Sequence, residues 1–445
     1  MITASQRPAL RRILGLGFGL AVIFGGTVGV GILRMPGIIA AQLGSFWPIL
    51  LVWTAGGLYA LLGALSIAEL GTALPQAGGF TIYAKRAFGP VTGFAVGWAD
   101  WLNNCAVIAY GAVAAAEYLA RIFPRAASRE SWLALTLLLL LTALHWMGLR
   151  LSSTVQQLTS AVTIITFLLL AAACFLHPAQ PGTAALPILR HAGFFWALVP
   201  IVAALRAIVV TYDGWYEAIY FTEEDTDTAR HLPRAMIGGV LIVLALYLLM
   251  NLAFLHVLSI PALAASTLPA ADAARLVIAH GSGTFITVLA LLTLLSLINA
   301  VLLGAPRILL AIARDGILGA RATQVAPSGT PRPALLITAA TAALFILSGK
   351  FEDIIAVAAI LVAALYCVNY IAVIVLRIRE PQLPRPFRAW GYPFTTFAVL
   401  TGSFLFLIAA SHDDPSSTLR AAILLAVAIP AYLFLRRRQR VTTLS

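Results

Sequence analysis

Long runs of apolar residues recur along the chain and are separated by short polar segments. A helix needs about 20 apolar residues to cross the hydrocarbon core of a membrane, and the runs are of this order. Together they predict an all-α membrane protein with twelve transmembrane helices in a single domain, residues 1–445. The runs cover residues 13–40, 47–72, 91–123, 131–149, 154–176, 193–222, 234–258, 282–313, 333–349, 353–377, 394–411 and 418–435.

The composition supports this interpretation, because 61% of the 445 residues are hydrophobic and only 10% are charged. Soluble proteins carry about 25% charged residues, so a soluble enzyme and a disordered chain are excluded. The net charge of +12 does not indicate nucleic acid, since the charges lie between the apolar runs. Of the 29 Lys and Arg residues, 19 fall on the side of both termini, 7 on the other side and 3 within the runs. This bias predicts a protein of the cytoplasmic membrane with both termini cytoplasmic.

The first apolar run contains a dense group of glycines, Gly25, Gly26, Gly29 and Gly31. Each glycine weakens a helix by about 1 kcal/mol, so the helix is expected to unwind around residues 26–31. Unwound backbone at membrane depth must line a cavity within the protein, because lipid offers no hydrogen-bond partners. The exposed N–H groups at the start of a half-helix favour an anion such as a carboxylate.

A second interruption, Thr211-Tyr212-Asp213-Gly214-Trp215, lies in the sixth run. Runs one and six are the first members of two five-helix halves, and paired interrupted helices indicate the central site of a transporter. Glycines in membrane helices also mark close helix packing, which we expect for Gly15, Gly17 and Gly19. For the two matching breaks, a substrate site is the better interpretation.

Five motifs in chain order resemble those of the amino acid permeases of the amino acid–polyamine–organocation (APC) superfamily. They extend over nearly the whole chain and lie at the expected runs. They comprise the glycine break followed by Arg34-Met35-Pro36-Gly37; Ala68-Glu69-Leu70-Gly71 with Arg86-Ala87-Phe88-Gly89; Tyr212, Gly214 and Trp215 with Glu223-Glu224; Arg307 with Ala313-Arg314-Asp315-Gly316; and Arg379-Glu380-Pro381 with Gly391-Tyr392-Pro393.

The resemblance implies a five-plus-five inverted-repeat fold with broken helices 1 and 6. Residues 13–176 would form the first repeat, 193–377 the second, and 394–435 helices 11 and 12. It also implies secondary transport of amino acids by alternating access, without a cofactor. The expected substrate-binding residues hold the α-carboxylate on backbone N–H groups (Val28, Gly29, Val30, Gly31) or line the amino and side-chain end (Gly26, Thr27, Val210, Thr211, Asp213, Trp215).

The coupling ion is open at this stage. Many sodium-independent relatives carry a lysine in helix 5 where this chain has Thr163. Sodium-coupled relatives use hydroxyl groups in the middle of helix 8, where residues 297–304 of this chain offer only Asn299 as a polar side chain. Proton symport and exchange therefore both stay possible.

Charged residues within the runs need a partner or a function, because a charge at the bilayer centre costs about 2.5 kcal/mol or more. Asp213 is a candidate for attracting a substrate cation or a proton, or for capping the unwound turn. Arg206, Glu217 and Asp100 are further gating or coupling candidates, or structural partners. We expect Glu69 to pair with Arg86 or Lys85 in an inner gate, and Arg34 and Arg307 to make cytoplasmic-side contacts.

Two other classes of function were compared with transport. A membrane-embedded enzyme needs clustered His, Asp or Glu, and a channel needs repeated pore segments, and neither pattern occurs in the sequence. The scattered histidines predict no metal site. The three cysteines, Cys105, Cys174 and Cys367, lie in apolar runs, and the 120–130 loop has none. A disulfide-linked partner subunit is therefore not expected.

Overall fold

The computed structural model describes residues 10–123, 129–179, 194–278, 280–349 and 351–442. These residues form helices joined by turns, and their only β-type pairing is an isolated bridge between Leu14 and Asp225. The all-helical architecture predicted from the apolar runs is confirmed for this part of the chain.

Nine helices among the described residues are long and apolar enough to cross a membrane. They are α3 (Phe46–Ala73), α5 (Pro90–Ile122), α6 (Glu130–Met147), α7 (Leu149–Leu176), α9 (Thr228–Val257), α12 (Ser282–Arg314), α14 (Phe351–Arg379), α15 (Phe394–Asp413) and α16 (Pro415–Thr442).

The first apolar run forms two helices, α1 (Leu16–Thr27) and α2 (Gly31–Leu43), which are bent by 48° at the break between them. The pair passes the same test as a single span and brings the candidates to ten. Two shorter apolar helices occur at the sixth and ninth runs, within α8 (Phe194–Thr211) and in α13 (Arg332–Ser348). The predicted break in the first helix is thus confirmed.

Several ends differ from the predicted runs because polar residues extend the helices. The run predicted at 234–258 begins at Thr228 in α9, and the run at 154–176 begins at Leu149 in α7. Glycines mark the ends of two other helices. Gly44 ends α2 in the left-handed conformation, and Gly89 is the residue before Pro90, which takes the first position of α5.

Short helices lie outside the long ones. α4 (Phe80–Phe88) lies between α3 and α5. α10 (Ile260–Ala265) and α11 (Pro269–Val277) lie between α9 and α12 in the chain, and both pack on α2. Two 3₁₀-helices are η4 (Glu217–Phe221) and η5 (Ala320–Thr323).

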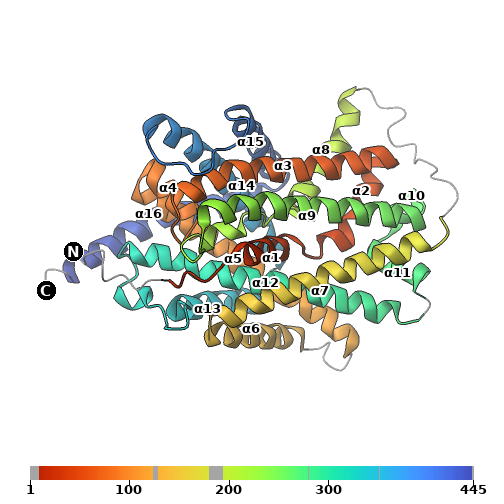
Figure 1. Cartoon of the computed structure of the whole chain (residues 1–445), viewed down its shortest axis with the longest axis horizontal. Helices are drawn as coiled ribbons and strands as arrows, with labels where there is room; N and C mark the ends of the chain where they lie inside the picture. The colour runs from red at the N-terminus through yellow and green to blue at the C-terminus, as the bar shows by residue number, and fades with distance from the viewer. Residues whose placement is uncertain (1–9, 124–128, 180–193, 279, 350, 443–445) are drawn as a thin grey trace.

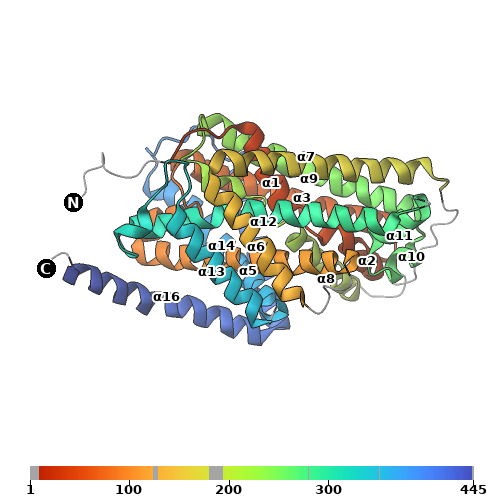
Figure 2. The ribbon, with the colours of Figure 1, turned by 90° about the horizontal axis from the view of Figure 1, so that it is seen from below.

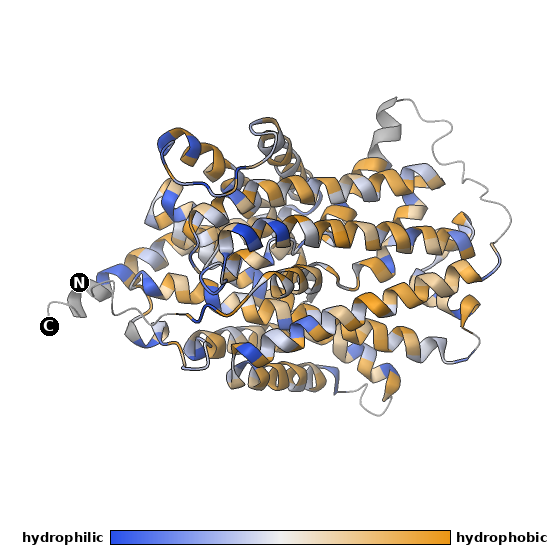
Figure 3. Cartoon of the chain, in the orientation of Figure 1, coloured by the Kyte–Doolittle hydropathy of each residue, from blue (hydrophilic) through white to orange (hydrophobic). Residues whose placement is uncertain are grey.

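The long helices run roughly along one direction, and α12 lies among them with α5, α7, α1 and α13 as neighbours (Figures 1 and 2). The segment leading into α1 and the C-terminal end of α16 lie at the same end of the bundle, which we call the terminus end. α10 and α11 lie at the opposite end, called the far end. Hydrophobic residues cover most of the helices, and many hydrophilic ones gather toward the terminus end (Figure 3).

Candidate functional site

The break between α1 and α2 leaves backbone groups open at the centre of the bundle. Val28 is extended, and its N–H still donates to the carbonyl of Phe24 at 2.8 Å, so α1 closes there. The next bond of this kind runs from Leu33 N–H to the carbonyl of Val30 at 3.1 Å. Within the described residues, no backbone bond is present for the N–H groups of Gly29, Val30 and Gly31. These groups are the unsatisfied donors that any helix start presents.

The second interruption is also present, immediately after α8. The helix ends at Thr211, and residues 212–216 form turns before η4 begins at Glu217. Gly214 has a φ of +98°, a left-handed conformation that favours glycine. The predicted span 193–222 is therefore not one continuous helix. It contains an α-helix up to Thr211 and the short 3₁₀-helix η4, and the polar cluster at 211–215 separates them.

The two breaks lie against each other. A methyl group in place of the Gly214 hydrogen would lie 2.3 Å from the carbonyl oxygen of Gly26. A methyl group on Gly31 would lie 2.8 Å from Cγ2 of Thr211. Glycine is thus required at the contact between the half-helices, because any side chain would separate them.

A cavity of about 520 Å³ adjoins both breaks. Ligand cavities in proteins range from about 300 to 1,000 Å³, so the size suits a small molecule. Eight of the ten predicted substrate-binding residues line it: Gly26, Thr27, Gly29, Val30, Gly31, Val210, Thr211 and Asp213. Residues of α5, α14 and α15, including Asn103, Tyr366 and Phe406, complete the wall.

Val28 and Trp215 lie outside this lining. The Val28 side chain is 1% exposed within the core. Trp215 is 2% exposed and packs against the rings of Tyr216 and Tyr366, each with a centroid distance of 5.5 Å. Trp215 therefore supports the wall through Tyr366 in this conformation.

Two charged side chains of opposite sign line the cavity. Asp213 accepts a hydrogen bond from the hydroxyl of Tyr366 on α14. Arg34 lies on α2, the half-helix that packs on α8, α10 and α11. We expected Arg34 and Arg307 to make contacts on the same side, but the structure separates them, because α2 packs on α10 and α11 of the far end whereas Arg307 pairs with Glu224.

The other gating and coupling candidates are dispersed. Arg206 pairs with Asp413 at the end of α15. Asn299 contacts His145 Nε2 at 2.9 Å and donates to Gln156 Oε1 at 2.7 Å, so its amide is occupied by other side chains. Thr163 is fully buried, and its hydroxyl has no hydrogen-bond partner in the part of the chain that the structure describes. Glu217 and Asp100 are buried beside the second break.

Two ion pairs between α12 and the segment after η4 lie toward the terminus end. Arg307 of α12 binds both carboxylate oxygens of Glu224 at 3.0 Å, and both side chains are at most 2% exposed. Arg314, about two helical turns further along α12, binds Glu223 at 2.7 Å. The cytoplasmic-side contact predicted for Arg307 therefore lies at the terminus end.

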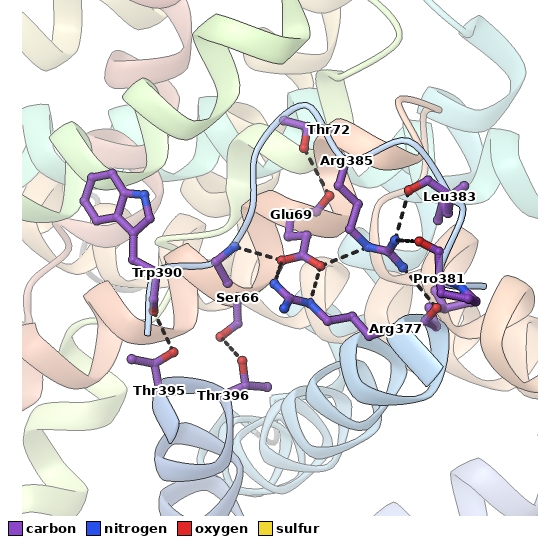
Figure 4. A network of polar contacts seen from close by, with 12 residues as sticks. Ser66, Glu69, Thr72, Arg377, Pro381, Leu383, Arg385, Trp390, Thr395 and Thr396 are labelled. Carbon is purple, nitrogen blue, oxygen red and sulfur yellow. Dashed lines mark hydrogen bonds and ion pairs between the residues drawn. The ribbon is translucent and has the colours of Figure 1, made fainter. Parts of the chain in front are cut away.

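Glu69 takes part in a separate network at this end (Figure 4). Its carboxylate is bound by Arg377 of α14, by Arg385 at 3.1 Å and by the backbone N–H of Ala389 at 2.8 Å. The predicted pairing of Glu69 with Arg86 or Lys85 is wrong. Those two side chains point away on α4, where Arg86 binds Glu380 and Lys85 binds Asp315.

The cavity, in contrast, reaches toward the far end. Its lining includes Ile38, Val210 and Ile355, which are 45%, 50% and 36% exposed. The ion pairs described above and these exposed lining residues thus lie toward opposite ends of the bundle.

Sequence reasoning missed two side chains that join the breaks to their surroundings. The hydroxyl of Tyr247 on α9 reaches the backbone carbonyls at both breaks, and the hydroxyl of Tyr220 on η4 binds Asp100. Tyr247 is a single tyrosine in an apolar run, and Tyr220 is one of several aromatic residues between 212 and 221, so nothing in the local pattern distinguishes either from a packing aromatic.

Comparison with known proteins identifies the family. A family model described as amino acid permease matches residues 18–429. The chain is 26% identical to the serine/threonine exchanger SteT of Bacillus subtilis (strain 168), over 98% of this chain and 99% of the relative. It is 25% identical to the b(0,+)-type amino acid transporter 1 of Mus musculus, over 93% and 85% of the two chains. The Asc-type amino acid transporter 1 of Mus musculus is 28% identical, over 86% and 74%.

The family model covers most of the chain, and the three relatives are matched over 74–99% of their own length. The chain therefore belongs to the amino acid permease family of the APC superfamily, and it is a multi-pass membrane protein that transports amino acids and is not an enzyme.

Proposed function

We propose that the transported amino acid binds in the cavity between the two broken helices. The observation that supports this most strongly is the set of backbone N–H groups at Gly29, Val30 and Gly31, which lack backbone partners in the described part and line the cavity. The start of α2 carries the positive end of the helix dipole, which favours a carboxylate. Val28 N–H would join them only if its bond to Phe24 opens.

The cationic end of the substrate is assigned to the second break. The C-terminal turn of α8 presents its carbonyl end, and Asp213 places a carboxyl group in the same cavity. Asp213 would attract the α-ammonium group or a basic side chain. Gly26, Thr27, Val210 and Thr211 line the remaining space, and Trp215 holds Tyr366 in place behind Asp213.

We also propose how many times the chain crosses the membrane and on which side its termini lie. The nine long helices, the bent pair and the two shorter apolar helices together give twelve passes. The breaks then fall in the first and sixth passes, as expected for two inverted five-helix repeats with α15 and α16 outside them. The excess of Lys and Arg at the terminus end supports a cytoplasmic location for both termini.

The proposed mode is exchange or proton-coupled transport, and the name of one relative, the serine/threonine exchanger SteT, is an argument for exchange. In this scheme the cavity is open to the outside in the present conformation, and the ion pairs at the terminus end separate when it opens inward. The chain is proposed to work without a disulfide-linked subunit, because its three cysteines are buried.

Reconstituted proteoliposomes test this assignment. Vesicles loaded with unlabelled amino acid should take up labelled serine, threonine or arginine by counterflow. Amines that lack the α-carboxylate, and acids that lack the α-amino group, should not compete. Equal competition by either analogue would contradict the proposed site. Asp213→Asn should reduce uptake of arginine more than that of serine, and an equal loss for both would remove the role assigned to Asp213.

A further inference from the structure

Two buried carboxyl groups lie beside the second break, outside the cavity lining. Glu217 begins η4 and is 2% exposed, and Asp100 on α5 is fully buried. Tyr220 lies between the two, because a methyl group on Gly304 would lie 3.0 Å from both Glu217 Oε2 and Tyr220 Cδ2, and the Tyr220 hydroxyl lies 2.9 Å from Asp100. Asp213 precedes Glu217 in the same broken segment. The three acids therefore form one group that extends from the cavity toward the terminus end.

The Glu217 side chain occupies space provided by two glycines. A methyl group on Gly26 of α1 would lie 2.5 Å from Cγ of Glu217, and one on Gly304 of α12 would lie 3.0 Å from its Oε2. This oxygen is buried and has no hydrogen-bond partner among the described residues. A buried carboxylate without a partner is very unfavourable, whereas the protonated acid is tolerated.

Asp100 has only neutral partners. The hydroxyl of Tyr220 lies 2.9 and 3.0 Å from its two oxygens, and Asn104 Nδ2 donates to Oδ1 at 3.2 Å. These donors favour a charge on Asp100 but do not balance it. With Glu217 nearby, the pair is expected to share at least one proton.

The cations packed nearby are already in use. Arg307 of α12 donates Nε and Nη2 to Glu224 and Nη1 to the carbonyl of Leu303. Arg314 binds Glu223, and His231 at the start of α9 contacts Asp225. α1 contains no ionisable residue, and the ionisable side chains beside Glu217 on η4 and the turn before it are Tyr220 and Tyr216. The carboxyl pair thus has no counter-ion in the part of the chain that the structure describes.

A metal ion does not suit this place. No group of three or more His, Cys, Asp or Glu side chains among the described residues is arranged to hold one. A proton needs only a carboxyl oxygen. Intramembrane acids of this kind mark proton pathways in pumps and transporters.

Tyrosines connect the pair to the cavity. Tyr366 donates its hydroxyl to Asp213, and its ring lies 5.7 Å from that of Tyr216. The Tyr216 ring lies 6.1 Å from that of Tyr220, whose hydroxyl binds Asp100. The three rings therefore pack in a row between the cavity and the pair, and the hydroxyl groups at the two ends of the row bind Asp213 and Asp100.

We propose that Glu217 and Asp100 form a proton-binding site and that amino acid transport is coupled to proton movement through it. This rests on the proposed binding of substrate beside Asp213. The proton enters from the cavity and binds a carboxyl oxygen of the pair. When the terminus end opens, water reaches the pair and stabilises the charged form, and the proton leaves on that side.

Proteoliposomes with a trapped pH-sensitive dye test the proposal. The dye records whether the pH of the vesicle interior changes when the amino acid enters. Counterflow of labelled amino acid is measured in the same vesicles. In buffers in which potassium replaces sodium, the wild-type protein should move protons together with its substrate. It should also accumulate the substrate inside the vesicles when a pH gradient is applied. Glu217→Gln and Asp100→Asn should keep counterflow and lose substrate-driven proton movement. Glu117→Gln, which changes an exposed carboxyl on the same helix as Asp100, should keep both.

The outcomes separate the two proposals. Absence of counterflow in the wild-type protein would refute amino acid binding in the cavity. Counterflow without proton movement in the wild-type protein would refute the proton site alone, and this measurement needs no variant to fold. Retention of proton movement in both Glu217→Gln and Asp100→Asn would also overturn it, as would accumulation that depends on sodium and not on pH.

Discussion

The hydroxyl of Tyr247 lies 3.2 Å from the backbone carbonyl of Thr27, the last residue of α1. The same hydroxyl lies 3.2 Å from the carbonyl of Thr211, the last residue of α8. The C-terminal ends of helices carry negative partial charge, so two such ends facing each other need a shared donor. Tyr247 supplies it from the unbroken helix α9 and holds the two breaks in register.

Tyr247→Phe should therefore weaken substrate binding and leave the fold intact. Loss of a buried hydrogen bond costs about 1 kcal/mol, so the KM for counterflow should rise several-fold and the unfolding temperature should fall slightly. Tyr118→Phe is the matched control, because that hydroxyl is buried without a hydrogen-bond partner among the described residues. An unchanged KM in Tyr247→Phe would show that the breaks do not depend on this hydroxyl.

Gly214→Ala should abolish transport. The added methyl group would lie 2.3 Å from the carbonyl oxygen of Gly26, and the residue would also keep a strained φ of +98°. Gly281→Ala separates the two effects, since Gly281 has a φ of +80° but open space around its Cα. Backbone strain alone costs about 1–3 kcal/mol, so Gly281→Ala should lower the unfolding temperature and retain counterflow. Equal transport by the two variants would contradict the close approach of the breaks.

Local composition predicted the backbone of the site well. Crowded glycines between Gly25 and Gly31 disfavour a helix wherever they occur, and a polar cluster such as residues 211–215 is conspicuous in an apolar run. Both breaks lie where these signals place them, and most of the predicted residues line one cavity.

Side-chain partners were predicted less well, because they depend on segments that meet only in the folded chain. Glu69 is bound by Arg385 and Ala389 of a loop more than 300 positions away in sequence. Asn299 is held by His145 and Gln156 from two other helices. The register of these contacts is set by helix packing and has no signature near Glu69 or Asn299.

Val210→Trp should narrow the cavity toward the far end. Val210 lines the cavity and is 50% exposed, so an indole there extends over the substrate space without a core clash. Counterflow of large amino acids such as arginine or leucine should fall more than that of serine or alanine. Val202→Trp on the same helix is the control, because Val202 is 47% exposed outside the cavity lining. A uniform effect on all substrates in Val210→Trp, or the same selectivity change in Val202→Trp, would contradict this role.

Arg307→Met should destabilise the protein more than the double replacement Arg307→Met with Glu224→Met. The pair is bidentate and at most 2% exposed, so removing the arginine leaves Glu224 as a buried charge without a partner. Breaking such a pair costs about 3–5 kcal/mol, while replacing both partners by apolar residues is often close to neutral. Thermal unfolding in detergent measures the difference between the variants. Arg86→Ala at the exposed pair with Glu380 is the control and should leave the unfolding temperature unchanged, because surface ion pairs are screened by water. A double variant as unstable as Arg307→Met would mean that packing around the pair, and not the unpaired charge, sets the cost.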